Sequence, residues 1–324
     1  MSADNQQDGR QITTGIIYAL IGTFLFSAKP VLIKLAYQAG GDAVAIMALR
    51  AGSSVPLYLI ILLWLCRFPD NRQKLRKHGL KAAAIGILGY YLASYLDIEA
   101  LAYISAQLER LIIFLFPSFV VLLSWLYMKQ KPAPGVVSAV VGGYIGIAFI
   151  VVHDVGNPGL NVGLGSGLAL LSAFIFAHYL IFSKQAITRM GSLLFTCVGM
   201  GSAGLVILTQ ATFSDFDVTV MSGDFIALGV AIGIFCTVLP SFLIAAGMAR
   251  LSATQLSLAS NVGPAITAAL AVLVLGEAFT LYHAIGMTLV VFSVVRMSRK
   301  KPQPEEGNGV TGSPAVMKKE KTAE

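Results

Sequence analysis

The chain has 324 residues and a formal net charge of +7; 56% of its residues are hydrophobic and only 12% are charged. This charged fraction is about half that of an ordinary soluble domain, which argues against a soluble enzyme or binding module. The basic excess would suit nucleic acid, but its placement along the chain, described below, argues against that class of partner.

Long apolar segments follow one another along the chain. A run of about 20 apolar residues is long enough to cross a bilayer as a helix, and the sequence contains ten such runs. We expect residues 1–11 to form a polar cytoplasmic tail and residues 299–324 to form a disordered, basic and polar cytoplasmic tail. We expect an all-α integral membrane protein with ten transmembrane helices at roughly 13–36, 43–66, 79–98, 104–127, 134–152, 163–183, 192–213, 224–247, 251–275 and 279–298.

A pattern in the fourth span recurs in the ninth. Residues 104–117 begin with Ile-Ser-Ala-Gln-Leu and end in proline, and residues 251–264 begin with Leu-Ser-Ala-Thr-Gln and also end in proline. We therefore expect two five-helix repeats, at 12–155 and 156–298. Because five is an odd number of spans, the second repeat enters the membrane from the opposite side. The repeats are then inverted, and a functional site is expected between them.

The basic residues gather on one side of this arrangement. When ten helices are threaded in turn, 19 of the 23 Lys and Arg residues fall in loops and tails on the same side. This positive-inside pattern predicts a cytoplasmic (inner) membrane protein with both termini in the cytoplasm. The opposite loops carry no Lys or Arg but several acidic residues, namely Asp42, Asp154, Asp215, Asp217, Asp224 and Glu277.

Polar residues form a stripe on the fourth span and again on its repeat partner. Gln107, Arg110, Phe114 and Pro117 fall within about 80° around a helix. A helix that lines a wet cavity tolerates such a stripe, although hydrogen bonds that merely join helices would also explain it. We favour the cavity and expect both prolines to break their helices, so that the halves can rock. The counterparts in the second half are Thr254, Ser257, Asn261 and Pro264.

The third span carries a second stripe, which is also interpreted as cavity-lining. Tyr90, Ser94 and Asp97 follow one another at i, i+4 and i+7, and Tyr91 lies beside them near the middle of the span. Their counterparts in the eighth span include Thr237 and Ser241.

Five charged residues lie deep within the spans of the first half. Each costs about 2.5–3.5 kcal/mol at the centre of an isolated helix, so each needs a partner or a function. One interpretation is a structural ion-pair network, for example Arg110 with Asp97. The other is a substrate anchor at Arg110 supported by Lys29, with proton-coupling carboxylates. The five residues are Lys29, Arg50, Asp97, Glu109 and Arg110.

Motifs for other chemistry are weak. Residues 199–204 fit a dinucleotide-binding glycine pattern, but they lie in an apolar span with no strand before them. We therefore expect no cofactor, no metal site and no enzymatic activity, since neither a nucleophile elbow nor ligand spacing is visible. The glycine pairs at 163/167 and 229/233 predict close helix packing. The histidines lie on separate elements, at His78, His153, His178 and His283.

Two segments carry a family resemblance. Residues 89–97, Gly-Tyr-Tyr-Leu-Ala-Ser-Tyr-Leu-Asp, and residues 103–110 resemble bacterial EamA-type members of the drug/metabolite transporter superfamily. Arg50 and the Leu-Gly-Glu ending at Glu277 are similar as well, whereas the first half has Gln130 where the second has Glu277. The resemblance covers about residues 12–298. It implies ten helices in two inverted repeats, with metabolites passing through a central cavity.

The function predicted from these observations is secondary transport. We expect efflux of a small amphipathic or amino-acid-like metabolite by alternating access. The lipid bilayer surrounds the protein. Protons are a candidate coupling ion, and the protein is a candidate homodimer. The competing interpretations are a membrane-embedded enzyme and a channel or structural scaffold. The crowding of charge in one half favours a gated site over an open pore.

Overall fold

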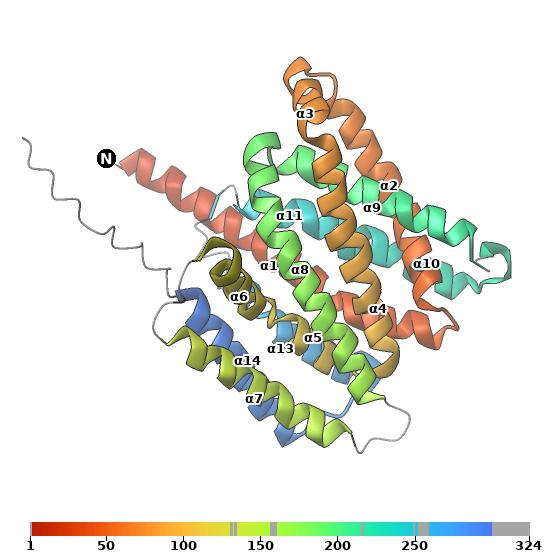
Figure 1. Ribbon diagram of the computed structural model, residues 1–324, viewed down its shortest axis with the longest axis vertical. Coiled ribbons are helices and arrows are strands. Elements are labelled where there is room, and N and C mark those ends of the chain that lie inside the picture. The colour runs from red at the N-terminus through yellow and green to blue at the C-terminus, as the bar shows by residue number, and fades with distance from the viewer. Residues whose placement is uncertain are drawn as a thin grey trace, which may run out of the picture.

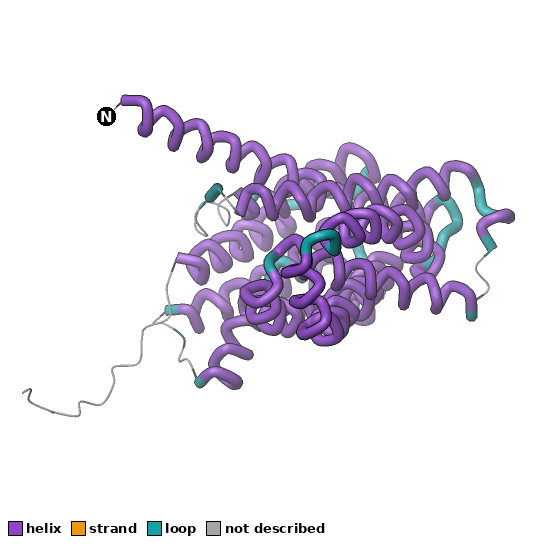
Figure 2. Tube along the Cα trace, turned by 90° about the horizontal axis from the view of Figure 1, so that it is seen from above, coloured by secondary structure: helices purple, strands orange, loops and turns teal. Residues whose placement is uncertain are grey.

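The computed structural model describes residues 2–129, 132, 135–155, 161–214, 217–248, 250–251 and 259–299. All regular elements in these segments are helices (Figure 2). This agrees with the predicted all-α fold class.

The first half runs from α1 to α7 (Figure 1). Two of its five spans are interrupted, because the third contains a π-helical turn and the fourth breaks between α5 and α6. The basic segment that begins at Pro69 is helical and lengthens the third span beyond the predicted 79–98. Proline suits this first turn, where its missing N–H has no helical partner to lose. The elements are α1 Ser2–Gln38, α2 Ala43–Leu65, α3 Pro69–Gly86, η1 Ile87–Leu92, α4 Ala93–Tyr103, α5 Ala106–Ile113, α6 Phe116–Met128 and α7 Val136–Asp154.

The second half repeats this order. Its third span again contains a π-helical turn, and its fourth includes α13, which ends in another. The elements are α8 Val162–Met190, α9 Ser192–Thr212, the 3-10 turn η2 Val218–Val220, α10 Gly223–Gly233, η3 Ile234–Val238, α11 Leu239–Met248, α13 Gly263–Leu270, η4 Ala271–Leu275 and α14 Leu281–Arg299.

The described helices are long and apolar enough to form a membrane bundle. Eight of them have the length and hydropathy of a membrane span, and the apolar helices Gly263–Leu275 and Leu281–Met297 are shorter. Large apolar side chains such as Leu63 and Leu273 are exposed on the outside of the bundle, where lipid solvates them. The protein is therefore a multi-pass membrane protein with the predicted ten-helix architecture.

Contacts between the helices come in matched sets, as a pseudo-two-fold axis requires. The first span, α1, packs on α11 of the second half, and its counterpart α8 packs on α4 of the first half. Likewise α3 packs on α9, and its counterpart α10 packs on α2. Two further pairs, α2 with α9 and α7 with α14, join a helix to its own counterpart; α7 and α14 lie side by side in Figure 1. The contacts between the halves therefore follow the repeat.

Glycines allow the two halves to approach closely. A Cβ atom on Gly86 would lie 2.2 Å from the Cα of Gly199, and one on Gly233 would lie 2.7 Å from the Arg50 carbonyl oxygen. Gly229 is also packed tightly against a neighbouring helix, so the packing role predicted for the pair at 229/233 is confirmed. The same prediction for the pair at 163/167 is wrong, because no described atom lies within 4 Å of either added Cβ. These two glycines face outward from the bundle.

Candidate functional site

The π-helical turns in the third and eighth spans occupy equivalent positions in the two repeats. The turn at Ile87–Leu92 holds Tyr90, and the turn at Ile234–Val238 holds Thr237, whose hydroxyl donates to the Ile232 carbonyl at 3.0 Å. Such turns are rare and occur often at functional sites. The regular 3.6-residue periodicity does not predict them, because it has no place for the extra residue that such a turn contains.

Arg50 joins the second span to the third. Its guanidinium donates to the Ser94 hydroxyl at 2.7 Å and to the Tyr90 carbonyl oxygen at 3.3 Å. The side chain is buried, so these bonds compensate for part of its lost hydration. The stripe predicted on the third span therefore faces Arg50.

A small cavity lies beside this contact, between the two halves. Its volume of about 20 Å³ has room for about one water molecule. Arg50, Tyr90 and Thr237 line it, as does Tyr58, whose hydroxyl lies 3.2 Å from that of Ser241. This volume is too small for a metabolite, so a substrate can enter here only if the helices move.

Two tyrosines that the sequence analysis did not select complete this region. Tyr58 on α2 lines the cavity, and Tyr179 on α8 donates to the Tyr90 hydroxyl at 3.1 Å. Their signal in the sequence is weak, since each lies in an apolar span without the polar stripe that marks the third span. Tyr91, which was expected to line the cavity, instead packs against a hydrophobic cluster that includes Met47 and Ile98.

Four charged residues meet next to this region, and we call them the central charged cluster: Lys29, Asp97, Glu109 and Arg110. Lys29 Nζ lies 2.6 Å from Asp97 Oδ2, and both side chains are mostly buried. Glu109 and Arg110 are within electrostatic reach of Asp97. The direct partner of Asp97 is thus Lys29, whereas the sequence analysis named Arg110, because packing brings α1 against α4.

Several buried polar atoms in this cluster and beside it have no hydrogen-bond partner among the described residues. In the described part of the chain, six such buried atoms lie on α1, α4 and α5; one of them, Gln107 Oε1, lies away from the cluster, and the other five belong to it or to α1 beside it. A buried polar atom without a partner costs about 1–3 kcal/mol, so water or a bound molecule is expected there. The Arg110 guanidinium also points toward Gly263 of the second half, since its Nη2 would lie 3.2 Å from a Cβ placed on that residue. The five atoms are Thr23 Oγ1, Ser27 Oγ, Asp97 Oδ1, Glu109 Oε2 and Arg110 Nε.

The residues of the stripe predicted on the fourth span lie in different surroundings in the structure. Arg110 reaches the central charged cluster, but Phe114 packs against a buried apolar cluster that includes Leu108 and Val290. Gln107 donates from Nε2 to the Ala278 carbonyl oxygen at 3.4 Å, away from the cluster. In the second half, Asn261 lies in the turn before α13 and is half-buried. Thr254 and Ser257 lie outside the described residues.

Both prolines follow an interruption of the helix. The chain leaves the helical conformation at Phe114 and Leu115, and Pro117 then lies in the first turn of α6. Pro264 lies in the first turn of α13, after a turn that contains Asn261. Proline is tolerated in a first turn. The interruptions thus lie just before the prolines rather than at them.

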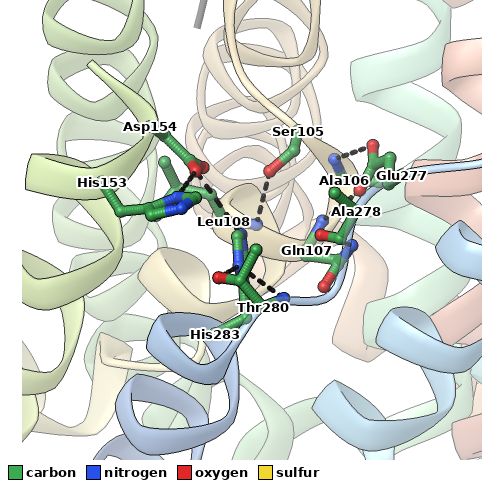
Figure 3. Close-up of polar contacts among 10 residues, drawn as sticks. All are labelled: Ser105, Ala106, Gln107, Leu108, His153, Asp154, Glu277, Ala278, Thr280 and His283. Atoms are coloured by element: carbon green, nitrogen blue, oxygen red, sulfur yellow. Dashed lines mark hydrogen bonds and ion pairs between the residues drawn. The ribbon is translucent and has the colours of Figure 1, made fainter. Parts of the chain in front are cut away.

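A carboxylate from the second half caps the start of α5 (Figure 3). The Ala106 N–H donates to Glu277 Oε1 at 2.7 Å, and the Gln107 N–H donates to Oε2 at 3.3 Å. Ser105 adds a cap from its own chain segment, because its hydroxyl accepts from the Leu108 N–H at 3.2 Å. The first N–H groups of a helix lack helical partners and carry positive partial charge, so an anion stabilises them. Glu277 therefore ties the second half to the fourth span of the first.

Replacing Glu277 with Ala should lower the free energy of unfolding by about 0.5–2 kcal/mol, which is typical of a lost helix cap. The melting temperature of the purified protein should fall by a few degrees. Glu277→Gln should lower it less, because the amide oxygen still accepts a hydrogen bond. Glu99→Ala is the matched control, since the Glu99 carboxylate accepts from Tyr103 on its own helix. A Glu277→Ala protein that melts with the wild type would show that the cap does not stabilise the fold.

Known proteins match this chain in both repeats. The model of the EamA-like transporter family matches residues 13–152 and 163–299. The "uncharacterized transporter YcbK" of Bacillus subtilis (strain 168) is 28% identical over 308 residues, which cover 93% of this chain and 98% of that protein. The "uncharacterized inner membrane transporter YicL" of Salmonella typhimurium (strain LT2) is 26% identical over 230 residues, covering 69% and 75%.

A solved structure supports the same fold. A crystal structure of another protein superposes with a TM-score of 0.56 over 88% of this chain and 97% of its own, at 18% sequence identity. The family match, the relatives named as transporters and the ten apolar helices agree with one another. The chain is a membrane transporter and belongs to the EamA-like transporter family.

Proposed function

We propose that the protein is a secondary transporter that exports a small amphipathic or amino-acid-like metabolite by alternating access between two inverted repeats. The observation that carries this proposal is the central charged cluster, which lies next to the second half. Asp97 and Glu109 can hydrogen-bond to each other when one of them carries a proton, but Arg110 Nε, Thr23 Oγ1 and Ser27 Oγ have no partner among the described residues. A structural network alone would be expected to satisfy its own buried atoms. A site that exchanges water for substrate keeps them available.

Arg110 is the proposed anchor for an anionic group of the substrate. A guanidinium presents several donors in a planar fork, which matches a carboxylate through two bonds. Its Nε has no protein partner among the described residues, and its Nη2 lies at the boundary with α13. Lys29 supports this charge, and Arg50 with Tyr90, Ser94, Thr237 and Ser241 forms the polar wall nearby. Asn261, together with the predicted Thr254 and Ser257, would supply hydrogen bonds from the other half.

Asp97 and Glu109 are the proposed proton-coupling pair. Both carboxyl groups are buried, and each is within electrostatic reach of the other and of Lys29 and Arg110. A proton that binds to one of them would weaken its hold on the cations. Substrate release and proton movement would then be coupled, because both depend on the charge of the same carboxyl group.

The experiment that tests this function begins with a substrate screen. Purified protein is heated with individual amino acids and small amphipathic acids, and a compound that raises the melting temperature is then loaded into liposomes that contain the protein. We expect flux that depends on the protein and on a pH gradient. Pro117→Ala and Pro264→Ala should keep the ligand-induced shift but slow the flux about tenfold, which corresponds to about 1.4 kcal/mol in the barrier. Equal loss of folded protein and of flux would show that the prolines are only structural.

The proposed orientation places both termini in the cytoplasm of a cell with an inner membrane. In a background that lacks Cys66, Cys197 and Cys236, a cysteine at Lys74 should react only with reagents that reach the cytoplasm. A cysteine at Thr219, which is exposed in the loop before α10, should react only from outside. Labelling of both positions from the same side would contradict the inverted repeat.

A further inference from the structure

Two histidines and one aspartate meet where α7 ends and α14 begins (Figure 3). His153 Nδ1 lies 3.0 Å from Asp154 Oδ1, and His283 Nε2 lies 3.6 Å from the same oxygen. The three ligand atoms all lie within 4.8 Å of one another. This group belongs neither to the central charged cluster nor to the cavity, and the transport mechanism proposed above does not use it.

We propose that His153, Asp154 and His283 bind one divalent transition-metal ion, for which Zn²⁺ is the best match. Imidazole nitrogens and carboxylate oxygens bind zinc at about 2.0–2.2 Å, so neighbouring ligands of a tetrahedral ion lie about 3.3 Å apart. The observed separations of 3.0 and 3.6 Å lie on either side of that value. Three protein ligands leave a fourth position, which water would fill.

The surroundings of His283 suit a metal ligand. Its Nδ1 accepts from the Thr280 backbone N–H at 3.4 Å and lies 2.8 Å from the Thr280 hydroxyl. When an ion binds Nε2, the ring proton moves to Nδ1, which can then donate to that hydroxyl. Ligating histidines usually donate their other N–H to such a partner, which orients the ring. Asp154 and His283 are buried, whereas the His153 side chain is 27% exposed and gives an ion a path from solvent.

The expectation of no metal site rested on the absence of short ligand spacing, which this group does not have. His153 and Asp154 are adjacent, but His283 comes from the last helix of the other half. The site exists only because α7 packs along α14. The packing of the counterpart helices thus creates a donor set that the spacing does not show.

An ion at this position would join the fifth helices of the two halves at one end of the bundle. Thr280 also belongs to the segment 276–280, from which Glu277 caps α5 (Figure 3). If the halves rock as proposed above, bound zinc should slow that motion. This consequence rests on the proposed function, but the binding site itself does not.

The test measures zinc binding to the full-length protein after removal of any affinity tag. Chelator-treated protein at pH 7.5 is titrated with Zn²⁺ against a chromophoric competitor, and Co²⁺ replaces Zn²⁺ to report the coordination geometry by its absorption. We expect one Zn²⁺ per chain, a rise in melting temperature with zinc, and a tetrahedral Co²⁺ spectrum. Asp154→Asn and His283→Gln should weaken zinc binding about a hundredfold, which is about 2.7 kcal/mol. His78→Gln, which changes a histidine on α3, should bind as the wild type does.

Two outcomes would overturn the site. One is wild-type protein that binds no zinc while both variants melt earlier, because the three residues would then be a hydrogen-bonded link between helices. The other is zinc binding that persists in both variants. If Asp154→Asn does not fold, His153→Gln replaces it, since that ring is partly exposed. Flux in liposomes is measured separately, so that zinc binding without any transport would count against the proposed function and not against the site.

Discussion

Replacing Arg110 with Gln should reduce substrate flux about a hundredfold while leaving the yield of folded protein close to that of the wild type. The proposed bond between the guanidinium and an anionic substrate is charge-assisted, and losing it costs about 1.5–3 kcal/mol. A cost of about 2.7 kcal/mol corresponds to a hundredfold change in rate. Arg110→Lys keeps the positive charge but loses the planar fork, so flux should fall about tenfold. Stability should change less than on loss of Asp97, because Arg110 forms no ion pair within 4.0 Å among the described residues, whereas Lys29 and Asp97 are in direct contact.

Liposome flux and the ligand-induced rise in melting temperature measure this effect. Arg189→Gln is the matched control, since it removes an exposed guanidinium near the end of α8. A folded Arg110→Gln protein that transports its substrate at the wild-type rate would remove Arg110 from the site. The cluster would then be a structural ion-pair network, which was the competing interpretation.

Replacing Asp97 with Asn should destabilise the protein by about 3 kcal/mol, because it leaves the mostly buried ammonium of Lys29 without its partner. Removing both charges, in the double variant Lys29→Gln and Asp97→Asn, should restore most of the stability. Replacing a whole buried pair with neutral groups is often nearly neutral for stability. Flux should remain low in the double variant, because the proposed substrate site loses a cation and a proton acceptor together.

The measurements are the fraction of monodisperse protein after extraction and its melting temperature, for the wild type, both single variants and the double variant. Such a cycle isolates the coupling between the two side chains. The exposed pair of Lys74 with Asp70 provides the control cycle, in which coupling should be below about 1 kcal/mol. Additive losses at Lys29 and Asp97 would show that their 2.6 Å contact does not stabilise the fold.

Local patterns in the sequence determine the architecture and one side of the candidate site. Apolar runs of span length specify the membrane helices because a bilayer has one thickness. The recurrence of residues 104–117 at 251–264 indicates the repeat, and an odd number of spans per repeat makes it inverted. Helical periodicity also places Ser94 and Asp97 on one face of the third span, and both are buried toward other helices.

Periodicity does not describe a helix that is interrupted. The fourth-span stripe assumed one continuous helix, but the chain leaves that conformation at Phe114 and Leu115. Pro117 therefore lies on a separate helix, α6, whereas Arg110 and Phe114 remain on one helical stretch, in which the Phe114 N–H donates to the Arg110 carbonyl oxygen at 3.0 Å. The neighbouring helices decide that Arg110 reaches the central charged cluster while Phe114 lies among apolar side chains. The π-helical turn around Tyr90 also interrupts the regular spacing, because the extra residue in the turn changes the direction of the side chains beyond it.

The sequence by itself thus determined which segments cross the membrane, how the two halves are related and which polar residues need an explanation. The tertiary structure decided their partners: Lys29 for Asp97, the start of α5 for Glu277, and His283 for Asp154. Each of these contacts joins residues on different spans, and two of them join different halves. Hydropathy and periodicity describe one span at a time, whereas such a contact depends on which faces of two helices meet and at what depth in the membrane. Packing between whole helices sets both.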